Sequence, residues 1–175
     1  MGALDVSQTR GLIILATLGI VGVQLTVFTQ WRFDGAVVML VWLWPLAVGL
    51  TGLTSLALVV GIVTGLLFDA QSATPFGLSA LVAVALAFVA SRLGKEGVGD
   101  LDSAAIWVTP GIAAVGGLLA PALYVASGVF ALNFSLWHGS VINSMLVNAV
   151  AFAVLARPVT RFAFALSRSA LRTRR

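Results

Sequence analysis

The sequence predicts an all-α integral membrane protein with six transmembrane helices in one compact bundle. Of 175 residues, 60% are hydrophobic and only 9% are charged, and the mean hydropathy is +1.08. Soluble domains carry about 25% charged residues, so this chain lacks the polar side chains that would cover a water-facing surface. It contains no cysteine, which excludes disulfides and thiolate chemistry. We expect residues 1–175 to form a single transmembrane domain with no soluble domain attached.

Six apolar runs approach the roughly 20 residues that a helix needs to cross a bilayer. The third run is short and ends at Asp69, whereas the fifth is long enough to tilt and contains Pro121. Only Thr51–Thr54 separates the second and third runs, so a broken re-entrant pair is the alternative there. The predicted spans cover residues about 11–29, 36–52, 55–68, 76–93, 104–132 and 141–156, followed by a basic amphipathic tail over 157–175.

The distribution of positive charge predicts the orientation of these spans. With six spans, nine of the ten basic residues fall on one side of the membrane, and only Arg32 falls on the other. Lys and Arg are enriched in the cytoplasmic flanks of membrane proteins. We therefore expect both termini in the cytoplasm, with Trp31 and Trp137 at the outer interface and Trp107 near the inner one.

Two predicted spans carry small residues at helical spacing. Gly61 and Gly65 form a G-x-x-x-G pair on the third span. Small residues let helix backbones approach closely in lipid, either inside the bundle or against a partner helix, and both interpretations stay open. The fifth span repeats the pattern through Gly111, Ala113, Ala114, Gly116, Gly117 and Ala120.

Asp69 is the only ionisable side chain that we predict at membrane depth. A charged residue costs about 2.5–3.5 kcal/mol at the centre of a transmembrane helix and less near the interface. Asp69 could bind a cation, transfer a proton or pair with a partner's Arg or Lys. The structural alternative is that its carboxylate accepts hydrogen bonds from the Gln71–Thr74 turn or caps the fourth helix.

Polar side chains also recur along the sixth span. Ser140, Ser144 and Asn148 follow i, i+4, i+8 spacing, with Asn143 alongside. Such a stripe can hydrogen-bond to neighbouring helices. The alternative is a small-molecule pocket, which Asn133 would complete.

The C-terminal tail alternates arginines with apolar residues. As a helix it would lie along the inner leaflet, where each Arg contributes about 1 kcal/mol near anionic lipid. Docking of a cytoplasmic protein is the alternative. The predicted lipid-facing residues are Arg157, Arg161, Arg168 and Arg172.

We expect no enzymatic activity, no cofactor, no metal and no nucleic-acid partner. The sequence holds no H-E-x-x-H, Walker loop, G-x-S-x-G motif or carboxylate pair. Ser127 and His138 weakly resemble the serine motif of rhomboid proteases. However, Val125 replaces the leading glycine of that motif, and His138 lies in a predicted loop instead of on a facing helix. The single histidine has too few partners for a metal site.

One segment has an ordered pattern of its own. An apolar helix with small residues ends in Leu-Leu-x-Asp, then come a short Ser/Thr-containing turn and a Phe-Gly restart. This order resembles the MreD family, rod shape-determining membrane proteins of the bacterial cell-elongation machinery. Phe33-Asp34 is similar to the family's Pro-Asp segment, with Phe33 in place of the proline. The likeness covers residues 33–93 as sequence and the rest as layout. The matching positions are Gly61, Gly65, Leu66, Leu67, Asp69, Ser72, Pro75, Phe76, Gly77 and Leu78.

The resemblance implies a non-enzymatic scaffold in a bacterial cytoplasmic membrane. MreD proteins associate with MreC, a single-span protein with a large extracytoplasmic part. Through MreC they join the MreB filament and the peptidoglycan synthase formed by RodA and its penicillin-binding partner. On this interpretation the partner helix contacts Gly61, Gly65, Asp69, Ser72, Pro75, Phe76 and Gly77.

The six-helix layout is also similar to that of the S components of vitamin-uptake transporters, which gives the alternative function. Those proteins bind a small vitamin in an extracellular-facing pocket and dock to their transport module through an Ala-x-x-x-Ala pattern on the first span. Here Ile20 follows Ala16 at that spacing, so the pattern is altered. The pocket would comprise Asn133, Ser140, Asn143, Ser144 and Asn148.

Overall fold

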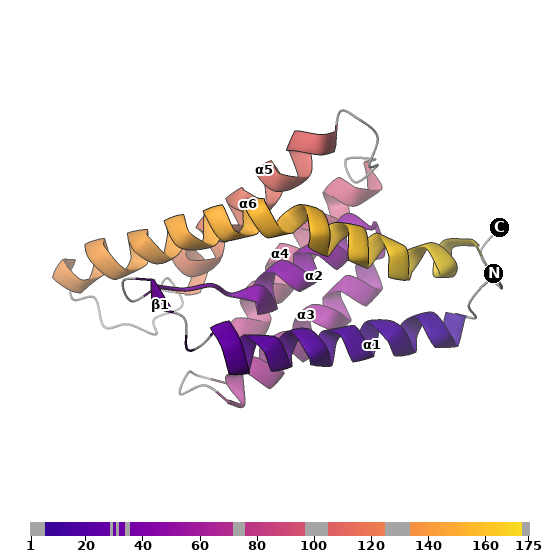
Figure 1. Cartoon of the computed structure of the whole chain (residues 1–175), viewed down its shortest axis with the longest axis horizontal. Helices are drawn as coiled ribbons and strands as arrows, with labels where there is room; N and C mark the ends of the chain where they lie inside the picture. Colours follow the sequence, from indigo (N-terminus) through magenta and orange to yellow (C-terminus); the bar gives the residue numbers. More distant parts are fainter. Residues whose placement is uncertain are drawn as a thin grey trace.

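The computed structural model describes residues 6–28, 30, 32–33, 36–71, 76–96, 105–124 and 134–172. Within these ranges, the side chains of residues 6–10, 32–33, 105–108, 124, 134–141 and 168–172 are not described. The described chain is almost entirely helical (Figure 1). Its elements are α1 (Val6–Val23), the π-helical turn η1 (Gln24–Phe28), β1 (Arg32–Phe33), β2 (Ala36–Val37), α2 (Leu40–Leu50), α3 (Thr54–Asp69), α4 (Leu78–Lys95), α5 (Ala105–Tyr124) and α6 (Phe134–Arg172).

Helix α2 lies at the centre of the bundle. Every residue from Val41 to Leu50 is buried, and α2 contacts all five other α-helices of the described chain. Trp42 and Leu46 of α2 belong to the main core cluster with Leu86 of α4 and Phe152 of α6. A helix that is hydrophobic on all sides is stable only when other helices surround it. The apolar sequence of α2 therefore explains its central position.

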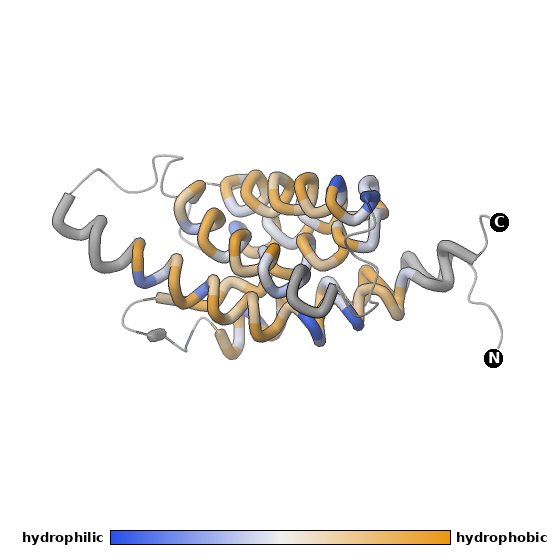
Figure 2. The backbone as a smooth tube through the Cα atoms, turned by 90° about the horizontal axis from the view of Figure 1, so that it is seen from above, coloured by the Kyte–Doolittle hydropathy of each residue, from blue (hydrophilic) through white to orange (hydrophobic). Residues whose placement is uncertain are grey.

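The outer faces of the bundle are apolar. Leu15 of α1, Leu81 of α4 and Val154 of α6 are 65%, 64% and 68% exposed. Figure 2 shows that hydrophobic residues predominate along the described helices. Among the described residues, three helical segments are long and apolar enough to cross a membrane: Gly11–Phe28, Leu78–Lys95 and Ile142–Ser167. These are the features of an all-α membrane protein, as the composition predicted.

Helices α1 and α6 run antiparallel along the same side of the bundle, and the start of α1 lies at the same end as the end of α6 (Figure 1). We call this the terminal end. The opposite end, where β1 and β2 pair, is the ribbon end. Helices α2, α3 and α4 follow one another in alternating directions, so the end of α2 meets the end of α4 near the terminal end. There Gly94 packs against the Leu50 carbonyl. Asp69, at the other end of α3, lies toward the ribbon end.

The small residues of α3 pack against α4. A Cβ atom on Gly61 would lie 3.1 Å from the Ala83 carbonyl carbon, and one on Gly65 would overlap the Ala80 backbone and lie 2.7 Å from the Ser79 carbonyl carbon. The Gly65 contact needs glycine, because any side chain there would push the two helices apart, and the Gly61 contact is tighter than a side chain usually makes. The face on which we expected a partner helix is thus occupied by α4, and packing within the bundle accounts for both glycines.

The small residues of α5 likewise allow close contact with α6 and α2. A Cβ on Gly117 would overlap the Asn148 carbonyl and lie 2.7 Å from Ala149 Cα, and one on Gly116 would lie 2.6 Å from Leu46 Cδ1. Gly111 differs, because it is exposed and has open space around its Cα. Most of the predicted small-residue stripe on α5 therefore faces the interior.

Helix α2 begins at Leu40, although we expected a helix from residue 36. Residues before it form a ribbon instead, with Phe33 opposite Ala36 and Arg32 opposite Val37. The 11 residues of α2 give about 16 Å of helix, short of the ~30 Å hydrocarbon core of a bilayer. The three-residue turn from Thr51, with Gly52 at φ +80°, then leads into α3.

The predicted sixth span and tail form one continuous helix, α6. It begins at Phe134, so His138 lies on a helix and the loop that we expected there is wrong. Pro158 lies inside α6 and does not end it. Ala156 and Thr160, on either side of the proline, are both buried against the bundle. On α5 the described helix ends at Tyr124, and the rest of the expected span to residue 132 lies outside the described residues.

The first half of the predicted tail packs into the bundle instead of lying free on the inner leaflet. Ala163 is buried in a cluster with Ile13 of α1, Trp44 of α2 and Ala57 of α3. Val159 and Leu166 pack against this cluster. These three α6 residues recur every three or four positions, so they form an apolar stripe that α1 covers. The apolar stripe of this part of α6 therefore packs against the bundle, while Arg161 is exposed outside that stripe.

The α3–α4 contact predicts opposite effects for two glycine-to-alanine substitutions. Gly65→Ala places a methyl group against the Ala80 backbone and should lower the free energy of unfolding by about 1–3 kcal/mol. Gly19→Ala, on the open face of α1, is the matched control and should be neutral or stabilise the helix by up to ~1 kcal/mol. Thermal unfolding in detergent, followed by circular dichroism, measures both. Equal effects would contradict the close contact.

Candidate functional site

The Asp69 carboxylate caps helix α4. Asp69 is the last residue of α3 and is only 3% exposed. The backbone N–H of Gly77 donates to its Oδ2 at 2.8 Å, and the N–H of Ser79 donates to Oδ2 and Oδ1 at 3.1 and 3.3 Å. A negative charge at the start of a helix satisfies free N–H groups and is favoured by the helix dipole. The structural alternative that we considered for Asp69 is therefore the observed geometry.

The turn between Asp69 and α4 contains the other residues of the predicted partner site. Gly77 has a φ of +96°, a left-handed conformation that glycine adopts without strain, and this orients its N–H toward Asp69. Phe76 is 72% exposed, the highest value among the large hydrophobic residues described as exposed. Ser72 and Pro75 lie outside the described residues. Among the predicted partner residues that the structure describes, only Phe76 presents a large side chain to the exterior.

A second polar cluster lies at the ribbon end of α2 and includes a residue that the sequence analysis missed. Gln24, at the start of η1, is fully buried. Its Nε2 donates to the Val38 carbonyl at 3.0 Å, and its Oε1 accepts from the Leu40 N–H at 2.6 Å. The available signal was one amide side chain within the apolar run of residues 11–29. A buried amide in a transmembrane helix requires hydrogen-bonding partners.

Asn148 of α6 holds the same segment from the other side. Its Oδ1 accepts from the Met39 N–H at 2.9 Å, and its Nδ2 donates to the carbonyls of Val37 at 3.0 Å and Ser144 at 2.9 Å. Asn148 is 1% exposed. The amide is thus fully engaged with protein backbone, which matches the interhelical interpretation of the polar stripe.

The structure describes the side chains of three of the five predicted pocket residues. Ser144 and Asn143 are half-buried on α6. Ser140 lies on α6 without a described side chain, and Asn133 lies outside the described residues. Ser144 lies one helical turn from Asn148, whose Nδ2 donates to the Ser144 carbonyl.

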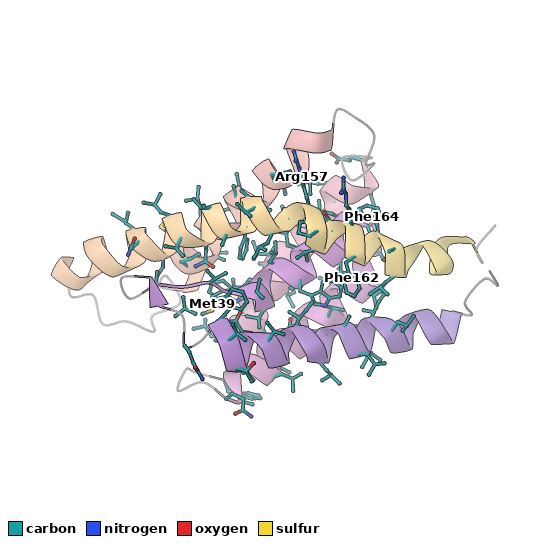
Figure 3. All side chains as sticks on the ribbon, viewed as in Figure 1. Met39, Arg157, Phe162 and Phe164 are labelled. Atoms are coloured by element: carbon teal, nitrogen blue, oxygen red, sulfur yellow. The ribbon has the colours of Figure 1, made fainter. Side chains whose placement is uncertain are left out.

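The described cationic side chains concentrate toward the terminal end. Arg92 and Lys95 are exposed on the last turns of α4, and the Arg92 guanidinium lies 5.0 Å from the Phe88 ring centroid. Arg161 is exposed on α6, and Arg157 is half-buried. Figure 3 shows Arg157 on the side of α6 away from α1. The remaining predicted tail residues, Arg168 and Arg172, lie at the end of α6 without described side chains.

No group of three or more His, Cys, Asp or Glu side chains that could hold a metal ion occurs among the described residues. Comparisons with protein-family models, curated proteins and solved structures gave no match.

The cap geometry predicts graded effects at Asp69. Asp69→Ala leaves the N–H groups of Gly77 and Ser79 without their acceptor and should lower the free energy of unfolding by about 1–2 kcal/mol. Asp69→Asn keeps one acceptor oxygen and should lower the free energy of unfolding by roughly half as much. Gln71→Ala, at an exposed position just beyond α3, is the control and should have no effect. Thermal unfolding in detergent tests the order, and an Asp69→Ala variant as stable as the parent would contradict the cap.

Proposed function

We propose that this protein is a non-enzymatic membrane scaffold of the MreD type, which binds an MreC-like single-span protein in a bacterial cell-elongation complex. The observation that carries the proposal is that the residues of the MreD-like pattern form one structural unit. Gly61 and Gly65 seat α3 on α4, and Asp69 fastens the turn through Gly77. A sequence pattern that builds a defined hairpin supports kinship more strongly than a set of scattered apolar matches.

The packing of α3 on α4 moves the proposed partner contact to the turn at the end of this hairpin. The inner face with Gly61, Gly65 and Asp69 is filled, whereas Phe76 is exposed. Exposed aromatic side chains are frequent anchors in protein interfaces. The partner therefore meets the hairpin at the turn, and the glycines act by fixing the position of that turn.

The proposed topology has six spans, both termini in the cytoplasm and the ribbon end outside. The alternating course of the helices, with the start of α1 and the end of α6 at one end, supports an even number of crossings. Arg92, Lys95 and Arg161 lie toward that end, as the preference for positive charge in the cytoplasm requires. The second crossing combines α2 with the four extended residues before it, which add about 13 Å.

In this proposal the protein acts through its partners. The single-span protein links it indirectly to MreB and to RodA with its penicillin-binding partner, and so to cell shape and the control of peptidoglycan synthesis. The exposed cations Arg92, Lys95 and Arg161 contact anionic lipid at the cytoplasmic surface. Little of the described chain extends beyond the helices, which suits an adaptor in the plane of the membrane.

The topology predicts which introduced thiols react from outside the cell. The chain has no cysteine, so Gln71→Cys and Glu96→Cys each create a single reactive site at an exposed position. A membrane-impermeant maleimide should label Gln71→Cys on intact spheroplasts, whereas Glu96→Cys should react only after permeabilisation. The reverse pattern, or labelling of both from one side, would overturn the proposed orientation.

The partner proposal predicts a defined complex in native mass spectrometry of the tagged protein, gently solubilised from its own membranes. A single-span protein with a large extracytoplasmic domain should appear in stoichiometric amount. Phe76→Ala should reduce its recovery roughly tenfold, since one buried aromatic anchor often contributes more than a kcal/mol. Phe88→Ala, an exposed aromatic toward the other end of α4, is the control and should leave recovery unchanged. A lone 18.1 kDa chain with a retained small molecule would instead favour the vitamin-binding alternative.

A further inference from the structure

Helices α1 and α6 are joined differently at the two ends of the bundle. Toward the terminal end they contact each other and the body of the bundle, through Ile13 and Ala163 in one buried cluster with Trp44. The Trp44 indole N–H also donates to the Thr17 hydroxyl of α1 at 3.0 Å. Toward the ribbon end, the extended chain that leads into α2 runs between α1 and α6 (Figure 1). Here the two helices are connected through that chain.

Two amide side chains make the hydrogen bonds of this connection, beside the apolar contacts of Val21 and Leu25 with the core. Gln24 binds the Val38 carbonyl and the Leu40 N–H from the α1 side, and Asn148 binds the Val37 carbonyl and the Met39 N–H from the α6 side. Asn148 therefore binds residues 37 and 39, and Gln24 binds residues 38 and 40, although the two amides lie far apart in the sequence. Figure 3 shows Met39 in this segment, close to the end of α1.

The side chains of Val38 and Val41 are buried, but the backbone of the segment has few hydrogen-bonding partners besides these two amides. Met39, at the N-cap position, makes no side-chain cap; its own N–H donates to Asn148, and the N–H of Leu40, the first residue of α2, donates to Gln24. Pro45 has no N–H, so the Val41 carbonyl lacks its usual partner in the helix. On the α1 side, Gln24 begins a π-helical turn, a less stable geometry than the α-helix. Segments whose order depends on a few side chains open at lower free energy than the core.

We propose that residues 37–40 form a latch between α1 and α6. When the Gln24 and Asn148 amides release it, the segment opens as one unit, and the ribbon end of α1 separates from α6. The contacts of Ile13 and Ala163 near the terminal end stay closed and act as the pivot. This proposal concerns the bundle itself and does not depend on the function proposed above.

Backbone hydrogen exchange of the full-length protein in lipid nanodiscs, resolved by residue, tests the latch. In the unmodified protein, the N–H groups of Met39 and Leu40 should exchange at least roughly tenfold faster than that of Val48, a buried interior residue of the same helix. Exchange at all three positions with one slow rate would overturn the proposal, because the segment would then open only when the whole bundle unfolds.

Gln24→Met removes one amide and keeps the length of the side chain. If the segment opens as a unit, exchange should accelerate at Met39 as well as at Leu40, by a similar factor of roughly ten, although Met39 is bound by Asn148. Acceleration at Leu40 alone would show two independent bonds and no latch. Thr26→Val is the control, because the exposed Thr26 hydroxyl bonds only the Gly22 carbonyl of its own helical turn, and it should leave both rates unchanged.

Spin-label distances measure the movement itself. Labels at Val27→Cys and Leu146→Cys report the ribbon end, and labels at Leu12→Cys and Arg161→Cys report the terminal end; all four positions are exposed, and the chain has no other cysteine. With Gln24→Met present, the first distance should lengthen or broaden while the second stays fixed. A change in both pairs would indicate general loosening, and a change in neither would mean that the amides do not hold α1 to α6; either result contradicts a pivoted latch.

Discussion

Backbone N–H and C=O groups that leave a helix inside a membrane need partners from the protein, because lipid tails offer none. In this bundle that constraint bears most heavily on residues 37–40, where the extended chain enters α2. Gln24 and Asn148 supply the missing donors and acceptors from α1 and α6. Because α2 is the central helix that every other helix contacts, the placement of the whole bundle depends on how this short extended segment is satisfied.

The same constraint explains why the α3–α4 hairpin is built as it is. The turn after Asp69 leaves the first N–H groups of α4 without helical partners, and the Asp69 carboxylate accepts from two of them. These hydrogen bonds to Asp69 are possible only if α3 and α4 lie close together at this end of the hairpin. Gly65, one helical turn before Asp69, removes the side chain that would keep the backbones apart. Close packing and capping are therefore two parts of one arrangement, since the cap requires the contact that glycine allows.

Periodicity and composition predicted those features that depend on neighbours in the sequence. They predicted a helical membrane protein, glycines at close helix contacts, a capping role as one alternative for Asp69, and a bonded polar stripe that includes Asn148. They failed where the outcome depends on distant residues. The bonds that hold the entry of α2 join residues 14 to 16 positions apart on the α1 side and 109 to 111 apart on the α6 side. The continuous course of α6 likewise depends on Ile13 and Ala57, which cover its C-terminal half.

The placement of polar groups also limits how the protein can recognise anything else. The hydroxyl of Thr64 and the amides of Gln24 and Asn148 make hydrogen bonds inside the bundle, whereas the outward faces carry residues such as Leu15 and Val154. In the plane of the membrane, a partner therefore meets mainly apolar surface, which distinguishes one helix from another by shape alone. Chemical specificity must come from the two ends of the bundle, where aromatic and cationic side chains are exposed. In the proposed scaffold, the α3–α4 hairpin fixes where a partner binds, whereas the entry of α2 is the part of the bundle that can open.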